Sequence, residues 1–154
     1  AAEQAAPLAK DRDVRVLPTK TIPQGISAML MFDETASADE NQMNMLSAAE
    51  NVETAQVTFA ARDSEVDGKP IKQGEIMGLC NGKIKYIGND ITDIAVKAAH
   101  KLFKKGEHSL ITIIYGEGAS EDDAEAVEKA LYEKYGSDVV NGGQPIYYFI
   151  ISVE

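Results

Sequence analysis

The sequence of 154 residues is short of several residue types on which common functions depend. It has no Trp, and 6% of its residues are aromatic, so it offers few flat rings on which bases or sugars could stack. Its one cysteine, Cys80, cannot form an internal disulfide. It also contains no run of about 18 apolar residues, so we expect no transmembrane helix.

Positive charge is scarce as well, because 15 Lys and Arg stand against 25 Asp and Glu, which gives a net charge of −10. An acidic surface repels phosphate backbones and anionic lipid headgroups, so we expect neither a nucleic-acid partner nor binding to a membrane surface. Residues 1–13 have neither the basic region nor the apolar core of a signal peptide. Together with the single cysteine, this favours a cytoplasmic protein.

What is present, 44% hydrophobic and 26% charged residues, is ordinary for a globular protein. The patterns predict an α/β fold of α+β layers in two parts. In residues 1–50 we expect a helix tail or a disordered terminus at 1–9 and a short strand at 14–17. Two helices follow, one from Thr21 and one from Ser37, each opened by a capping box. Their apolar faces carry Ile22, Ile26, Met29 and Leu30 in the first helix and Met43, Leu46 and Ala49 in the second.

In the second part, residues 52–154, the predicted order is β-β-β-α-β-α-β. The first three strands form a meander, in which Asn81 and Gly82 are a strong hairpin signal. The other elements are a helix capped by Asp90, a strand at 110–115, a helix capped by Ser120 and a strand at 146–153. The residues expected to face inward from the last helix are Ala124, Val127, Leu131 and Tyr135. This order predicts a mixed β-sheet with helices packed on it.

The loop Thr19-Lys20-Thr21, between the predicted strand and helix, is the best candidate for an anion or partner site. It combines two hydroxyls and an ammonium with the free N–H groups of a helix N-terminus, which favour negative charge. Gln24 and Gly25 lie in the first turn of the same helix and belong to this candidate. The alternative is that Thr21 only caps the helix and Thr19 only closes a turn.

Two further positions complete the candidate binding residues. Gly142, Gly143 and Gln144 form a loop whose glycines could let a partner's backbone approach closely; the alternative is a loop that only leads into the last strand. Arg62 follows the first strand of the second part, where it either contacts a partner or pairs with Asp63.

No pattern for catalysis or metal binding stands out. Residues 116–120 follow a buried strand, but acids fill the next helical turn and no Lys-Ser/Thr pair follows the glycines, so they do not fit a phosphate loop. The acids of segment 33–40 match no Ca²⁺ loop. His100 and His108 lack ligand partners at the usual spacing, and Cys80 has no neighbour in sequence that would lower its pKa. We therefore expect a binding or scaffolding module with no catalytic residues and no metal site.

Four segments together resemble the C-terminal region of the bacterial fatty acid kinase family, often labelled dihydroxyacetone-kinase-like. They are Pro18–Gly25, Thr54–Thr58 with Arg62-Asp63, Gly142–Pro145 and Ile150–Glu154. The resemblance covers essentially the whole chain, and the run PTKTIPQG is fairly specific. It implies a fold similar to the DegV fatty-acid-binding proteins and to the substrate subunit of dihydroxyacetone kinase. Residues 1–50 would then be the remainder of a truncated first lobe, and residues 52–154 a complete second lobe.

The resemblance also implies a role. In this family an N-terminal domain, which this sequence does not include, binds ATP and Mg²⁺ through clustered aspartates. The C-terminal region is thought to engage a fatty-acid-loaded DegV-type carrier protein, so that the acyl carboxylate is phosphorylated for phospholipid synthesis. We therefore expect a non-catalytic docking domain whose partners are this carrier and the rest of the kinase, with a homodimer left open. The alternative is a domain that itself holds a fatty acid or a small hydroxyketone at the Thr19-Lys20-Thr21 loop.

Overall fold

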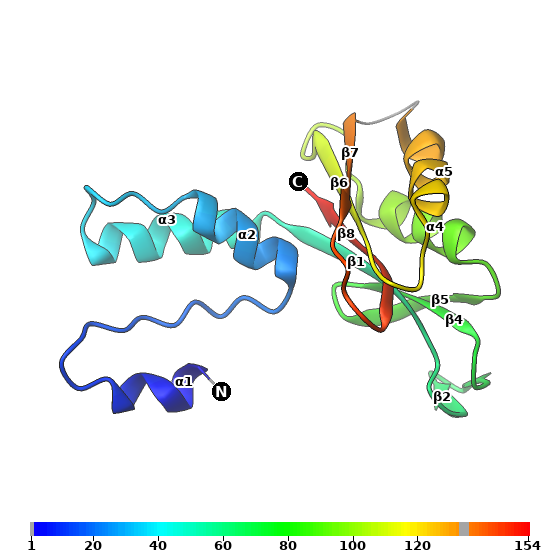
Figure 1. The fold of residues 1–154 in the computed structure, drawn as a ribbon, viewed down its shortest axis with the longest axis horizontal. Helices are drawn as coiled ribbons and strands as arrows, with labels where there is room; N and C mark the ends of the chain where they lie inside the picture. Colours follow the sequence, from blue (N-terminus) through cyan, green and yellow to red (C-terminus); the bar gives the residue numbers. More distant parts are fainter. Residues whose placement is uncertain (1, 133–135) are drawn as a thin grey trace. The chain divides into compact units, whose positions relative to one another are not determined.

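The computed structural model describes residues 2–132 and 136–154, and the chain divides into two units, residues 1–52 and 53–154. Between residues 2 and 52 the chain is helical or irregular and contains no strand (Figure 1). The helical segments are α1 (Ala2–Ala5), the short 3₁₀ helix η1 (Ala6–Leu8), α2 (Ile22–Leu30) and α3 (Ala38–Glu50).

The two longer helices of the first unit begin where the sequence predicts. Thr21 caps α2, because its side chain accepts a hydrogen bond from the Gln24 N–H at 3.4 Å. Ser37 and Glu40 form a complete capping box at α3. Ser37 Oγ accepts from the Glu40 N–H at 3.2 Å, and a Glu40 carboxylate oxygen accepts from the Ser37 N–H at 2.9 Å. Both caps satisfy N–H groups that have no partner within the first helical turn.

The strand predicted at residues 14–17 is wrong. Residues 13–20 have no regular structure, and Val14 is 44% exposed. A strand needs a neighbour that takes up its backbone hydrogen bonds, and residues 2–52 contain no other strand. Four apolar residues at the end of a loop are therefore not enough to define a strand.

The burial pattern of α2 and α3 also differs from the one that helical periodicity indicates. The apolar face of α2, formed by Ile22, Ile26, Met29 and Leu30, is exposed. The residues that α2 buries are Pro23, Ser27 and Ala28. On α3 the buried residues are Asn41 and Ala49, whereas Met43 is 67% exposed. The first unit thus carries apolar surface on a helix that the sequence describes as amphipathic.

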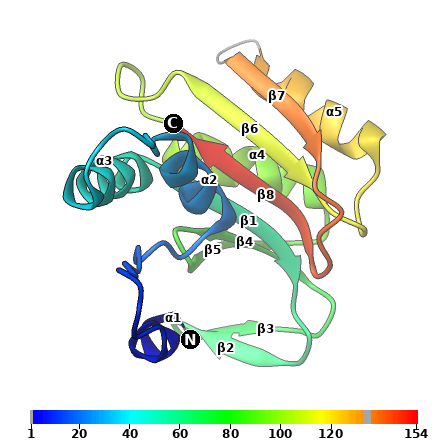
Figure 2. The ribbon, with the colours of Figure 1, turned by 60° about the vertical axis from the view of Figure 1, so that its left-hand side comes forward.

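The second unit is a six-stranded sheet with two helices against one face, beside a separate two-stranded hairpin (Figures 1 and 2). Its elements are β1 (Glu53–Phe59), β2 (Ser64–Val66), β3 (Lys69–Ile71), β4 (Ile76–Cys80), β5 (Lys83–Gly88), α4 (Ile91–Leu102), β6 (Leu110–Tyr115), α5 (Glu121–Tyr132), β7 (Gly136–Asn141) and β8 (Tyr147–Val153). The strand order in the sheet is β5-β4-β1-β8-β6-β7, and only β6 and β7 run parallel. The predicted mixed sheet with packed helices is confirmed.

The core of the second unit lies between this sheet and the helices α4 and α5. Alternate residues of the central strands face it, as expected for a sheet with one face against helices. The fully buried members from β1 and β8 are Ala55, Val57, Phe149, Ile151 and Val153. The helices contribute Ile94, Ala95, Ala98, Ala99, Leu102, Ala124, Val127 and Leu131. The inward face predicted for α5 is thus confirmed at three positions, and Tyr135 lies outside the described residues.

The second unit has more strands than the predicted order β-β-β-α-β-α-β. Asp67 and Gly68 join β2 and β3 into a hairpin that is separate from the main sheet. The other addition is β7, which lies at the edge of the sheet beside β6. Its sequence, GSDVVN, has neither strict alternation nor a continuous apolar run, so periodicity does not reveal it. The expected turn at Asn81 and Gly82 joins β4 to β5 with φ of +49° and +77°.

Candidate functional site

In the first unit, five candidate residues gather at the N-terminus of α2: Thr19, Lys20, Thr21, Gln24 and Gly25. The Lys20 N–H donates to Gln24 Oε1 at 2.9 Å, and the Gly25 N–H donates to the Thr21 carbonyl at 3.1 Å. Gln24 therefore folds back onto the residue before the cap and closes the turn. Lys20 is exposed. This helix end offers one exposed ammonium, while part of its hydrogen-bonding capacity is used by the cap.

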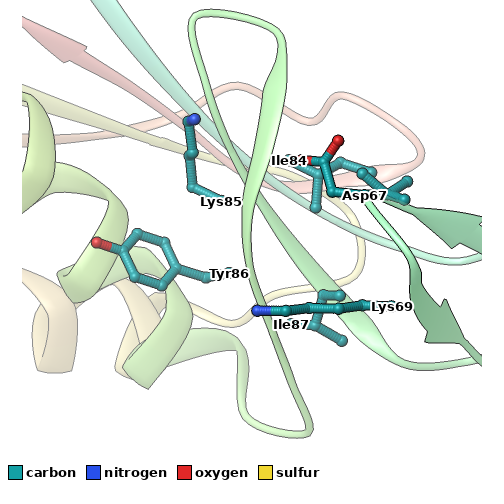
Figure 3. A pocket seen from close by; sticks show the side chains of 7 residues that line it. Asp67, Lys69, Ile84, Lys85, Tyr86 and Ile87 are labelled. Atoms are coloured by element: carbon teal, nitrogen blue, oxygen red, sulfur yellow. The ribbon is translucent and has the colours of Figure 1, made fainter.

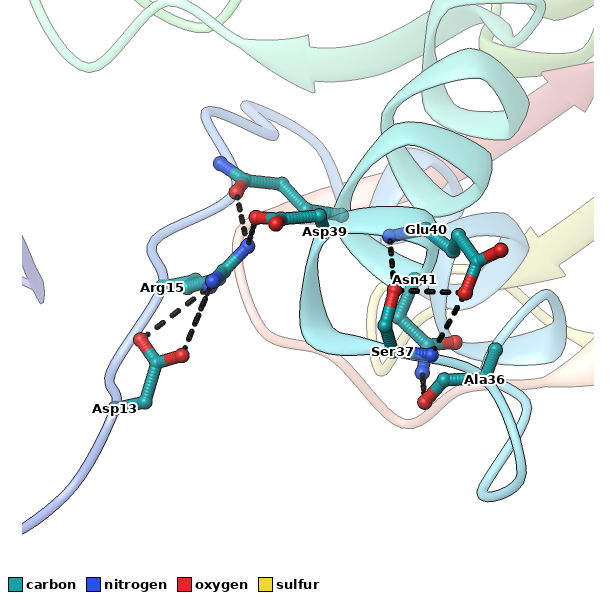
Figure 4. A network of polar contacts seen from close by, with 8 residues as sticks. Asp13, Arg15, Ala36, Ser37, Asp39, Glu40 and Asn41 are labelled. Atoms are coloured by element: carbon teal, nitrogen blue, oxygen red, sulfur yellow. Dashed lines mark hydrogen bonds and ion pairs between the residues drawn. The ribbon is translucent and has the colours of Figure 1, made fainter.

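Arg15, which the sequence analysis did not single out, ties the irregular segment to α3 (Figure 4). Its guanidinium donates to the Asp13 carboxylate at 3.1 Å and to Gln42 Oε1 at 3.2 Å, and it also contacts the Asp39 carboxylate. The hydrogen bonds from Asp13 and Asp39 raise the pKa of Arg15. Because Asp39 lies 24 residues further along the chain, sequence spacing gives no sign of this pair. Arg15 acts as a local tie and is not a free cation for a ligand.

In the second unit, the loop with Gly142, Gly143 and Gln144 is held by hydrogen bonds within the fold. Gln144 Nε2 donates to the Ile114 carbonyl at 3.1 Å, and the Gly142 N–H donates to the Tyr115 carbonyl at 2.9 Å. The loop therefore packs along the end of β6. Sequence reasoning placed Gln144 at a partner site, and the structure gives its side chain an internal role.

The same loop explains two glycines. A Cβ on Gly116 would overlap the carbonyl oxygens of Gln144 and Tyr147, and a Cβ on Gly142 would overlap the Gln144 amide and Ile114. Glycine is required at both positions because neighbouring backbone and side-chain atoms fill the space that a side chain would need. The close approach that the sequence analysis reserved for a partner is thus made by the chain itself.

Ile146, at the end of this loop, has an unusual backbone that the sequence does not announce. Its φ is +74°, and the Tyr147 N–H donates to the Pro145 carbonyl at 2.8 Å, two residues back. This is the rare γ-turn with positive φ, a strained conformation for a β-branched residue that costs about 1–3 kcal/mol. Thr58 Oγ1 donates to the Ile146 carbonyl at 2.9 Å and holds the turn in place. The Ile146 side chain is 65% exposed, so it adds little to the core.

Arg62 lies at the same end of the sheet as this loop. It follows β1, whose residue Thr58 pairs with Tyr147 at the start of β8, so the end of β1 and the loop before β8 meet there (Figure 2). The predicted alternative, an ion pair with Asp63, is not among the ion pairs of the described residues. Asp63 instead accepts a hydrogen bond from the Gln73 N–H at 2.7 Å. Arg62 is exposed.

A pocket of about 470 Å³ lies between the β2–β3 hairpin and β5 (Figure 3). Lys69 and Lys85 bring two ammonium groups to it, and Ile84 and Ile87 of β5 supply apolar surface. Both lysines are exposed. The pocket therefore suits a ligand with one anionic and one apolar end, and no spacing in the sequence marks it, because its residues meet only through the hairpin.

The remaining chemically versatile residues have structural partners. The acids of segment 33–40 are used locally: hydrogen bonds from Thr35 lower the pKa of Asp33, and those from Ser37 lower the pKa of Glu40. Cys80 is buried, its thiol lies 3.7 Å from the Ala98 carbonyl, and burial raises its pKa. Within residues 2–132 and 136–154 no three His, Cys, Asp or Glu gather as a metal site would require, and no helix there could span a bilayer.

The candidate residues therefore fall into two groups. Thr19–Gly25 belong to the first unit, whereas Arg62 and the loop 142–144 share one end of the sheet in the second unit. Sequence reasoning missed Ile146 and the two lysines of the pocket.

Comparison with known proteins places the chain in a family. Residues 1–154 match the FakA-like C-terminal family, which is described as the C-terminal part of fatty acid kinase proteins of the FakA type. Protein YloV of Bacillus subtilis is 45% identical over 160 residues, which covers 100% of this chain and 28% of that protein. An uncharacterized protein of Staphylococcus haemolyticus, SH1689, is 39% identical over 155 residues and is likewise covered to 28%. The chain thus spans little more than a quarter of the length of these relatives.

Solved structures of the DegV family share its fold. One from Ruminococcus gnavus, determined with vaccenic acid, has a TM-score of 0.63 at 15% identity and covers 99% of this chain and 64% of its own. Cg2579 from Corynebacterium glutamicum has a TM-score of 0.67 at 17% identity, covering 99% and 66%. At these identities the likeness shows the fold alone, and it confirms the DegV-like fold expected from the sequence. By its match over the full length, the chain belongs to the FakA-like C-terminal family of fatty acid kinase proteins.

Proposed function

We propose that this chain is the non-catalytic docking domain of a fatty acid kinase and that it binds a fatty-acid-loaded DegV-type carrier protein. On this proposal the rest of the whole protein holds ATP and Mg²⁺ and transfers the phosphoryl group to the acyl carboxylate. The resulting acyl phosphate supplies phospholipid synthesis.

Family membership over residues 1–154 carries this proposal. The chain spans 28% of its relatives, so the phosphoryl-transfer chemistry is assigned to the remaining part of the whole protein. A fatty acid as the cargo is supported by a solved structure described as a fatty acid binding DegV family protein, from Streptococcus agalactiae, with a TM-score of 0.51 to this chain.

Calorimetric titration of this chain with a fatty-acid-loaded DegV-type carrier from the same cell tests the proposal. We expect saturable binding. Lys20→Glu reverses the exposed charge beside α2, so it should weaken binding if the Thr19-Lys20-Thr21 loop belongs to the interface. Lys10→Glu makes the same charge change at another exposed lysine of the first unit and serves as the control. A folded chain that does not bind the carrier would overturn the proposal.

A second candidate function, direct binding of a fatty acid, is favoured by the pocket between the β2–β3 hairpin and β5. Lys69 and Lys85 could pair with a carboxylate while Ile84 and Ile87 contact the acyl chain. Ligand that binds only the folded state raises the melting temperature. Oleate should therefore stabilise the delipidated chain, and Lys69→Gln with Lys85→Gln should remove that gain. The same pair of changes at Lys97 and Lys101 of α4 is the control, since those lysines do not line the pocket.

A further inference from the structure

We propose that Ile146 is the anchor residue with which the second unit inserts into an apolar pocket of the DegV-type carrier. The inference rests on the proposed function and names the contact surface that the function requires.

The argument begins with a conflict between the residue and its position. A φ of +74° suits Gly or Asn and is strained for a β-branched residue. Burial of the side chain could compensate for such strain, but Ile146 is 65% exposed. The fold therefore gains little from isoleucine at this position. A contact outside the chain gives the side chain a use that the fold does not.

The strained turn is also held rigidly. Thr58 Oγ1 donates to the Ile146 carbonyl at 2.9 Å, and the Tyr147 N–H donates to the Pro145 carbonyl at 2.8 Å. On the other side of Pro145, Gln144 is fixed to the end of β6 through the Ile114 carbonyl. A side chain displayed by such a fixed backbone loses little conformational freedom on binding, which is the property expected of an interface anchor.

The surroundings of Ile146 have the composition of a small interface. Phe59, at the end of β1, is 39% exposed and packs edge-to-face on Tyr148 with ring centroids 6.1 Å apart. Arg62 and Glu117 are exposed at the same end of the sheet, where β1 and β6 end. Interfaces commonly place apolar anchors at the centre and charged residues at the rim. The complementary surface is an apolar pocket with an acidic group opposite Arg62.

Ile146→Gly separates this role from a structural one. Glycine accepts the positive φ, so the urea midpoint of unfolding should stay unchanged or rise, whereas the affinity for the loaded carrier should fall about tenfold or more. Ile146→Asn, which also tolerates positive φ, should behave in the same way. Ile146→Val keeps a branched apolar side chain and should retain most of the affinity. Asp67→Gly, at a φ of +52° in the β2–β3 turn, is the matched control, because it relieves positive φ away from this surface.

The outcomes distinguish the inference from the function on which it rests. Binding by the wild-type chain that is weakened in Ile146→Gly and Ile146→Asn, but not in Asp67→Gly, supports the anchor. Wild-type binding that survives both changes leaves the docking function intact and overturns the anchor. Loss of stability in Ile146→Gly would show that the side chain serves the fold, which also overturns it. Absence of binding by the folded wild-type chain overturns the docking function and, with it, the anchor.

Discussion

Gln144 Nε2 donates a hydrogen bond to the carbonyl oxygen of Ile114 at 3.1 Å, across 30 residues of chain. The same amide lies 3.4 Å from the Tyr147 carbonyl, and the Gln144 carbonyl accepts from the Glu117 N–H at 3.1 Å. One residue thus joins the end of β6, the loop after it and the start of β8. The rigid display of Ile146 depends on this junction, because Ile146 lies between Gln144 and the strand.

Gln144→Leu should therefore destabilise the second unit. The substitution keeps a side chain of similar size but removes the donor from the buried Ile114 carbonyl, and an unpaired buried polar group costs about 1–3 kcal/mol. Urea unfolding followed by circular dichroism would measure this loss. Gln73→Leu, at an exposed position, is the control and should change the free energy of unfolding by less than about 0.5 kcal/mol. Equal effects of the two substitutions would contradict the internal role of Gln144.

Gly116→Ala should be more disruptive than an ordinary glycine replacement. The added Cβ overlaps the carbonyl oxygens of Gln144 and Tyr147, and both belong to backbone that is held by hydrogen bonds. Overpacking of this kind costs about 3 kcal/mol, because the backbone must shift. Thermal unfolding would measure the effect. An alanine variant as stable as the wild type would show that the loop can move aside.

Gly25→Ala should have the opposite sign. Gly25 lies inside α2, and no atom lies within 4 Å of an added Cβ. Alanine is favoured over glycine in a helix by about 0.5–1 kcal/mol, so α2 should become more stable. Slower hydrogen exchange of the α2 amides would show this. If the variant also binds the carrier more weakly, Gly25 allows a partner to approach; unchanged affinity would remove Gly25 from the candidate site.

The parts of the fold that the sequence predicts are those in which one local signal decides the outcome. Asp90 and Ser120 cap their helices as expected, and the apolar run 110–115 forms a strand. The failures depend on partners distant in sequence. Residues 14–17 have strand-like composition but no neighbour to pair with, and β7 has no apolar pattern yet becomes a strand because β6 offers it an edge.

The candidate site follows the same logic. Thr21 is recognisable because a cap is local, and the structure places it as expected. The internal role of Gln144 depends on a carbonyl 30 residues away, so the sequence alone leaves its partner open. Ile146 looks like the first residue of an apolar strand, because its positive φ is imposed by the turn and by Thr58 and has no signature in residue type.

Asp123 should make the stability of the second unit depend on pH in the acid range. Its carboxylate accepts hydrogen bonds from the Ser120 hydroxyl at 2.7 Å and the Ser120 N–H at 2.9 Å, and these bonds lower its pKa below the ordinary value of 3.8. A depressed folded-state pKa stabilises the protein at pH values above the ordinary pKa. This contribution is lost as the pH falls through the lowered value, because protonation breaks the charge-assisted bonds.

The change can be followed at the carboxyl group itself and in the unfolding of the protein. In an NMR titration, Asp123 should titrate below its ordinary range in the wild type and move back toward it in Ser120→Ala, because the hydroxyl donor is the largest cause of the shift. In urea unfolding between pH 6 and pH 2, given as approximate limits around the ordinary pKa, Asp123→Asn should show a shallower loss of stability with acid. Asp122→Asn removes an exposed acid of the same helical turn that takes no part in the cap, so it should leave the Asp123 titration below its ordinary range. An Asp123 that titrates at or above its ordinary pKa would mean that the cap does not persist in solution.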